Sequence, residues 1–140
     1  MLGLLVVTHG GVAEELVASA RRIVGQVERL EAVSIDWNDD VDEATRRISE
    51  ALRRVDAGQG VLVLTDMFGG TPTNLALSLL EPGRVEIVTG VNLSMLIKFT
   101  NLREELSLLE TADAIAHQAR ETIQVASRLL ERGDAASEGT

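Results

Sequence analysis

The sequence predicts a single α/β domain: a doubly wound, mainly parallel sheet of four or five strands with helices on both faces. Short, nearly continuous apolar runs are typical of strands buried on both faces. Four such runs occur, at Leu2–Val7, Leu30–Ile35, Val61–Leu64 and Val85–Thr89. Helical patterns lie between them, and this alternation predicts parallel strands, for which we expect the order 2-1-3-4. A chain of 140 residues is long enough to bury one core without disulfides.

Each helix is indicated by apolar residues at three-to-four spacing. One stripe runs from Ala13 to Val24 and another from Val41 to Val55. The third helix is expected to begin with Thr71 as N-cap and Pro72 as its first residue, and a fourth to follow Asn92. The last stripe predicts one long helix from Ala112 to Leu130, after which the polar residues 131–140 are expected to fray.

Composition excludes several classes of function. A net charge of -9 and a pI near 4.7 argue against a nucleic-acid partner, which would need a basic surface. The absence of cysteine excludes thiol nucleophiles and thiolate zinc sites, and it fits a reducing compartment. The apolar N-terminus lacks a basic region and a cleavage site, and no apolar run approaches the roughly 18 residues of a membrane span. We therefore expect a cytoplasmic protein.

Polar, glycine-rich turns follow the predicted strands. In a doubly wound sheet, ligands bind outside the carboxyl ends of the strands, where the strand order reverses. The segments expected at that edge are Thr8-His9-Gly10-Gly11, Asp36-Trp37-Asn38, Thr65 to Pro72, and Gly90-Val91-Asn92.

His9 and Asp66 are the candidate catalytic residues. His9 should end a central strand before two glycines and a helix, whose N-terminal amides attract anions, so it is suited to carrying a phosphoryl group. With the order 2-1-3-4, the first and third strands lie about 4.8 Å apart, which predicts that Asp66 lies beside His9. A carboxylate that accepts from one ring nitrogen fixes the tautomer and frees the other nitrogen as nucleophile. A structural imidazole and a turn aspartate remain open readings.

The other candidates are expected to surround the phosphoryl group or to meet a partner. Glycine turns form anion-binding nests and threonine hydroxyls donate to anions; the predicted phosphate-binding set is Thr8, Gly10, Gly11, Gly69, Gly70 and Thr71. Met67 and Phe68 are apolar residues in a turn that should face solvent, so we predict a docking rim for a protein. Thr71 is equally well explained as a helix cap, and His117 as an ordinary helix residue.

Together these motifs resemble the IIA component of the mannose class of bacterial sugar phosphotransferase systems (PTS). The resemblance rests on Thr8-His9-Gly10, on the segment from Asp66 to Asn74, and on the segment from Gly90 to Leu96. It covers about residues 1–130, which we expect to form the IIA domain. Phe68 stands where tryptophan is common in the family, and Thr71 where serine is common.

The resemblance implies that His9 is a phosphohistidine carrier, loaded by phospho-HPr and unloaded onto a IIB component. It implies that Asp66 hydrogen-bonds the imidazole, and that the chain forms a homodimer with an exchanged C-terminal segment. The membrane components IIC and IID would be reached only through IIB. No metal or cofactor is expected, because phosphohistidine is already an activated donor.

Other functions remain open at this stage. A response-regulator receiver would use Asp66 as phosphoacceptor, but it needs an acidic pair where this chain has Thr8-His9. The phosphotransfer subunit of dihydroxyacetone kinase shares the expected fold and histidine. A regulatory phosphoprotein that reports the phosphorylation state of the PTS without sugar transport would use the same site. The sequence does not identify the transported sugar, because the resemblance implies a IIA domain, and IIA domains do not contact the sugar.

Overall fold

Four parallel strands form the sheet, in the order β2-β1-β3-β4. The structure, a computed structural model, describes residues 1–67, 70–102 and 104–138. Within these residues the strands are β1 (Gly3–His9), β2 (Leu30–Ile35), β3 (Val61–Thr65) and β4 (Val85–Thr89). The predicted strand order is therefore confirmed, and β1 extends two residues beyond the predicted apolar run to include His9.

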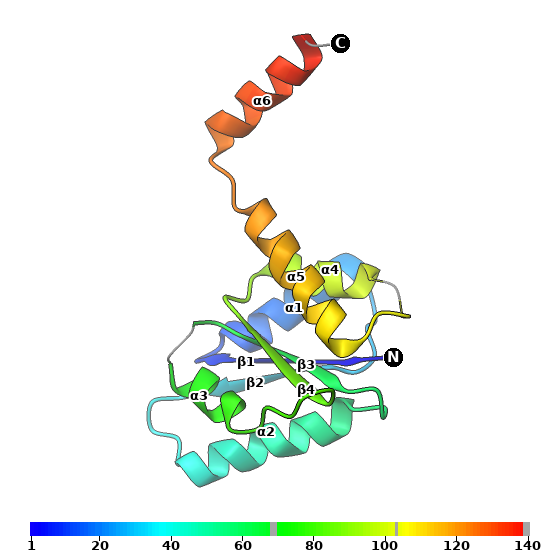
Figure 1. The fold of residues 1–140 in the computed structure, drawn as a ribbon. Helices are drawn as coiled ribbons and strands as arrows, with labels where there is room; N and C mark the ends of the chain where they lie inside the picture. Colours follow the sequence, from blue (N-terminus) through cyan, green and yellow to red (C-terminus); the bar gives the residue numbers. More distant parts are fainter. Residues whose placement is uncertain (68–69, 103, 139–140) are drawn as a thin grey trace.

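Helices cover both faces of the sheet (Figure 1). Their bounds are α1 (Val12–Val24), α2 (Val41–Val55), α3 (Thr71–Leu77), α4 (Leu93–Asn101), α5 (Leu108–Thr122) and α6 (Ala126–Glu138). In Figure 1, α1, α4 and α5 lie on one side of the strands, and α2 and α3 lie on the other. The alternation of strand and helix thus produces the doubly wound arrangement that it predicted.

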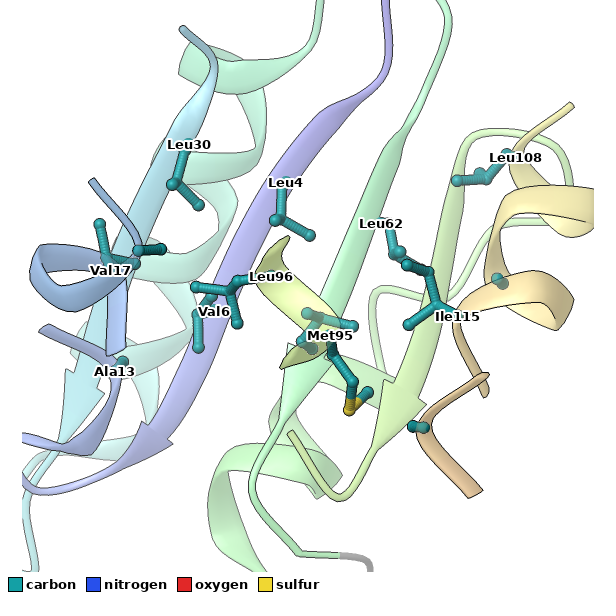
Figure 2. Packing of buried hydrophobic residues seen from close by; sticks show 14 residues of the cluster. Leu4, Val6, Ala13, Val17, Leu30, Leu62, Met95, Leu96, Leu108 and Ile115 are labelled. Atoms are coloured by element: carbon teal, nitrogen blue, oxygen red, sulfur yellow. The ribbon is translucent and has the colours of Figure 1, made fainter. Parts of the chain in front are cut away.

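The core consists of two clusters separated by the sheet. Along β1, Leu4 and Val6 pack toward α1, α4 and α5, while Leu5 and Val7 pack toward α2 and α3. Successive side chains of a strand point to opposite faces, so a strand buried on both faces must be apolar throughout. Figure 2 shows the first cluster, which includes Leu62 of β3, Met95 of α4 and Ile115 of α5. This continuous burial fixes β1 and β3 at the centre of the molecule.

The C-terminal part differs from its sequence-based prediction. The structure has two helices, α5 and α6, where one was expected, and they are separated by residues 123–125. The β-branched residues Thr122, Ile123 and Val125 gather at the break, and such side chains lose rotamer freedom in a helix. Residues 131–138, expected to fray, are helical, and α6 projects away from the sheet (Figure 1).

No helix in the described part of the chain is both long enough and apolar enough to cross a lipid bilayer.

Candidate active site

The two central strands bring His9 and Asp66 together. His9 is the last residue of β1, and Asp66 directly follows Thr65, the last residue of β3. The two strands are hydrogen-bonded neighbours, with Val7 opposite Thr65. Because parallel strands end at the same edge of a sheet, both side chains lie at the carboxyl edge, where the sequence placed them.

The Asp66 carboxylate accepts three hydrogen bonds. Its Oδ2 lies 2.8 Å from His9 Nδ1 and 3.0 Å from the His9 backbone nitrogen, while Oδ1 lies 3.0 Å from the Met67 backbone nitrogen. The His9 side chain is 40% exposed and that of Asp66 20%. The carboxylate is therefore fixed by its own turn and by the end of β1, and it holds the imidazole from one side.

The charge on Asp66 determines which ring nitrogen of His9 carries the proton. Partial burial raises the pKa of Asp66, but the hydrogen bonds from the His9 amide, the His9 ring and the Met67 amide outweigh it, so the pKa lies below its ordinary value. An ionised carboxylate can only accept hydrogen bonds. In the neutral imidazole, His9 Nδ1 is therefore the N–H of the ring and Nε2 keeps a free lone pair.

Gly70 closely approaches the free side of the imidazole. A Cβ atom placed on Gly70 would lie 2.7 Å from His9 Cε1 and 3.3 Å from Nε2. Real Cβ atoms do not approach ring atoms as closely as 2.7 Å, so a side chain here would displace the ring. Gly70 is thus required for a backbone segment to pass beside Nε2.

Two of the predicted phosphate-binding residues already use their polar groups in hydrogen bonds within the protein. Thr8 is fully buried; its hydroxyl accepts a hydrogen bond from the Ala13 backbone nitrogen at 2.7 Å and donates to the His9 carbonyl at 3.2 Å. The Gly10 backbone nitrogen donates to the Ile35 carbonyl at 3.0 Å. These groups shape the turn between β1 and α1, and neither is available to an exposed phosphate.

The remaining predicted residues fall into three groups. Gly11, Met67 and Thr71 are exposed at this edge. The N-cap of α3 is Gly70, so Thr71 and Pro72 each lie one position later in the helix than the sequence predicted. Phe68 and Gly69 lie outside the described residues. His117 is exposed on α5, well separated in the chain from this edge.

Sequence reasoning missed two features of the site. The Thr73 hydroxyl lies 2.9 Å from Thr65 Oγ1 and 2.5 Å from the Met67 carbonyl, so this buried residue of α3 ties down the turn that carries Asp66. Trp37, in the turn after β2, shares with His9 the lining of a hollow of about 200 Å³, together with Asp36, Thr71 and Leu75. In the sequence, the position of Trp37 in a turn after the second predicted strand is the only feature that points to this edge.

A second hollow lies elsewhere on the molecule. This hollow, of about 480 Å³, is lined by Met1, Val27 and Phe99, away from the His9–Asp66 pair. Among the described residues, no group of three histidine or acidic side chains is placed to hold a metal ion. What distinguishes the carboxyl edge is an imidazole oriented by a carboxylate and flanked by exposed backbone.

Comparison with known proteins identifies the family of this chain. Residues 3–116 match the model of the family described as "PTS system fructose IIA component". The chain belongs to the mannose-class PTS IIA family. It is 30% identical to the fructose-specific EIIA component of Bacillus subtilis over 141 aligned residues, which cover 100% of this chain and 97% of that protein.

Two further relatives place this IIA chain in context. The mannose-specific EIIAB component of Escherichia coli is 27% identical over 74% of this chain, which spans only 32% of that longer protein. The crystal structure of a PTS IIA protein associated with a fucose utilization operon of Streptococcus pneumoniae superimposes with a TM-score of 0.80 at 29% identity, covering 91% of this chain and 95% of the other. Family membership supports a phosphotransfer role within a PTS.

Proposed function

We propose that this IIA protein accepts a phosphoryl group from phospho-HPr on Nε2 of His9 and passes it to a IIB component. The observation that supports this most directly is the 2.8 Å contact between Asp66 Oδ2 and His9 Nδ1, because it leaves Nε2 as the nucleophile. The exposure of the His9 ring, 40%, is compatible with the approach of a protein donor. The same nitrogen serves both directions of transfer.

The transfer needs no net proton movement at His9. The Nε2 lone pair attacks the phosphorus of the donor phosphohistidine, a P–N bond forms at His9, and the P–N bond of the donor breaks as its imidazole leaves with the electron pair. The His9 ring keeps its proton on Nδ1 and so becomes cationic. The Asp66 carboxylate, 2.8 Å away, stabilises that charge while the group is carried.

The phosphoryl oxygens would be met by exposed groups beside Nε2. Phosphoryl transfer passes through a loose transition state with charge on the equatorial oxygens, so positioned donors lower the barrier. The backbone at Gly11 and Gly70 and the Thr71 hydroxyl are the described candidates, and Gly69 remains a predicted member of this set. Gly70 has the strongest support, because its backbone lies against the His9 ring.

The deciding experiment uses His9→Ala with His117→Ala as its matched control. Each variant is incubated with labelled phosphoenolpyruvate, enzyme I and HPr, and acid-labile label on the IIA chain is measured. We expect the His9 variant to lose all label and to remain folded, with its melting temperature lowered only by the loss of the hydrogen bond between the ring and Asp66. The His117 variant should be labelled normally. Label retained on His9→Ala would place the phosphosite elsewhere.

We further propose that the chain is a homodimer. Large apolar side chains are left exposed on α6 and the segment that precedes it: Ile123 is 77% exposed, Val125 60% and Leu130 69%. β4 is an edge strand, and a groove of about 410 Å³ runs beside it along α5. Exposed apolar surface on this scale marks an association site.

Light scattering tests the dimer. We expect about twice the 15.1 kDa chain mass at micromolar concentration, and a shift to the monomer mass for Leu130→Asp, which would place a charge in the apolar contact. A monomer mass for the unmodified protein would refute this proposal while leaving the role of His9 intact.

A further inference from the structure

Trp37 is the only tryptophan of the chain and its most conspicuous exposed side chain. It is 99% exposed, in the turn between β2 and α2. Tryptophan is highly buried on average in folded proteins, because its large ring gains much from leaving water. A wholly exposed indole on an otherwise aromatic-poor protein therefore calls for a functional explanation.

The turn that carries Trp37 is held in place. The Asp39 backbone nitrogen donates to the Asp36 carbonyl at 3.1 Å, and the Asp36 backbone nitrogen donates to Asp39 Oδ2 at 2.8 Å, so the turn is closed on both sides. Arg47 of α2 pairs with Asp39 Oδ2 at 3.3 Å and donates to the Ser34 carbonyl at 2.9 Å. A backbone held in this way leaves mainly the side-chain rotamers of Trp37 to be ordered when a partner binds.

Trp37 lies on the same surface as the nucleophile. Trp37 and His9 are both among the residues that line one hollow of about 200 Å³. Further large apolar side chains are exposed on the elements at this edge: Val41 at the start of α2 is 58% exposed, Met67 after β3 56%, and Val12 at the start of α1 47%. A protein that covers this surface when it reaches Nε2 would therefore contact Trp37.

The charge around Trp37 indicates which kind of partner fits. Asp36, Asp40 and Asp42 are exposed in or just after this turn, and none of them forms an ion pair with the described residues. Asp39 is already paired with Arg47. Asp40 also caps α2, where its Oδ2 accepts from the Glu43 backbone nitrogen at 3.1 Å. Acidic groups without a cationic side-chain partner around an apolar anchor favour a partner whose docking face is apolar at its centre and basic at its rim.

We propose that Trp37 is the anchor on which the phosphoryl-donating protein docks, with Asp36, Asp40 and Asp42 as the rim that receives its basic side chains. The occupant is a protein that presents a phosphohistidine within an apolar and basic face. This inference rests on the proposed function, because it supplies the docking surface for transfer to His9. Trp37 itself is a specificity residue and makes no contact with the reacting atoms.

The kinetic test compares Trp37→Ala with Trp37→Phe and with Ile23→Ala. Ile23 is a matched control because it is 61% exposed on α1, at the end of that helix farthest in sequence from His9. With HPr phosphorylated by phosphoenolpyruvate and enzyme I as donor, we expect Trp37→Ala to raise KM about 10- to 100-fold with an unchanged maximal rate, the loss typical of an interface anchor. Trp37→Phe should restore most of the affinity, and Ile23→Ala should match the unmodified protein.

Three results would overturn the inference. An unchanged KM for Trp37→Ala would show that Trp37 is not an anchor. An equal loss of rate with the small donor phosphoramidate would show that Trp37 acts in the transfer step itself. A slowing confined to the onward transfer to a IIB protein would show that the IIB protein, and not the donor, docks on Trp37. Absence of label on the unmodified protein, or label retained on His9→Ala, would instead refute the proposed function, so the two failures are distinguishable.

Fluorescence gives an independent readout, because the unmodified chain contains a single tryptophan. Titration with a tryptophan-free HPr should shift the emission of Trp37 to shorter wavelength as the indole leaves water. The shift should need more HPr at high salt and in Asp36→Asn, because the acidic rim is then screened or reduced. A constant emission spectrum at HPr concentrations that saturate transfer would contradict docking on Trp37.

Discussion

Three turns lie at the carboxyl edge of the sheet and are built in two different ways. The turns after β1 and β3 form one pair, and the turn after β2 is the second kind. In the first pair, His9 and Asp66 share a closed set of hydrogen bonds, and both side chains are partly withdrawn from water. In the second, the backbone is closed by Asp39 and Arg47 while the side chain of Trp37 is left wholly outside.

Under the proposed function, this difference separates chemistry from recognition. A nucleophile must be held in one tautomer and one orientation, which requires partners on one side and space on the other. An anchor for a protein must lose water only when the partner arrives, so its backbone is fixed and its side chain is not covered. Changes in the His9–Asp66 turns should therefore act on rate, and changes in the Trp37 turn on affinity.

Asp66→Asn should produce the largest effect of the substitutions that keep the nucleophile. The carboxylate faces three N–H donors, so the amide group of asparagine must point its NH₂ at one of them. We expect the rate of transfer to His9 to fall about 10- to 1000-fold, less than for the comparable substitution in a serine-protease triad, because the donor is already activated. Single-turnover labelling measures this; an unchanged rate would eliminate the orienting role.

The same variant should also lose about 1–2 kcal/mol of unfolding free energy, because a donor–donor contact replaces a charge-assisted hydrogen bond. Urea unfolding measures it.

Gly70→Ala tests the close approach to the imidazole, with Gly11→Ala as control. The added Cβ at position 70 would lie 2.7 Å from His9 Cε1, whereas a Cβ at position 11 would meet nothing within 4 Å. We expect Gly70→Ala to slow transfer about 10- to 100-fold by moving the ring out of line. Gly11→Ala keeps its backbone N–H and should be nearly neutral. Equal rates for the two variants would mean that the ring tolerates displacement.

Asp39→Ala tests the other turn. It removes the acceptor for the Asp36 backbone nitrogen and for Arg47, so the display of Trp37 should loosen. We expect KM for phospho-HPr to rise about 2- to 10-fold, with the maximal rate and phosphoramidate labelling unchanged. Glu28→Ala, exposed before β2, is the control for the loss of one negative charge. A fall in the maximal rate would show that the two turns are not independent.

The smallest effect concerns acid stability. The pKa of Asp66 is lowered in the folded protein, so its contribution to stability is present above the unfolded-state pKa and is lost as pH falls through the folded-state pKa. The difference in unfolding free energy between the unmodified protein and Asp66→Asn should therefore be constant near neutrality and shrink in acid. Urea titrations at several pH values measure it. A difference that stays constant down to strongly acidic pH would show that the carboxylate is not stabilised by folding.

Much of the candidate site was predictable because its determinants are local. His9 and Asp66 stand out as polar residues at the ends of apolar runs, and the ends of parallel strands converge whatever the side chains around them. The same reasoning did not reveal that the Thr8 hydroxyl and the Gly10 backbone nitrogen already form hydrogen bonds within the protein. Their partners, Ala13 and Ile35, are chosen by the exact path of the chain after β1, which no periodicity encodes.

The sequence by itself determined the layered fold, because strands buried on both faces must be apolar without interruption and helices must show one apolar stripe. It also determined that a histidine and an aspartate end neighbouring strands. Only the tertiary structure decided the contact of Nδ1 with Asp66, the passage of Gly70 beside Nε2 and the exposure of Trp37. Each of these depends on side chains and backbone segments that meet from different parts of the chain, and hydrogen-bond geometry at that scale is set by packing.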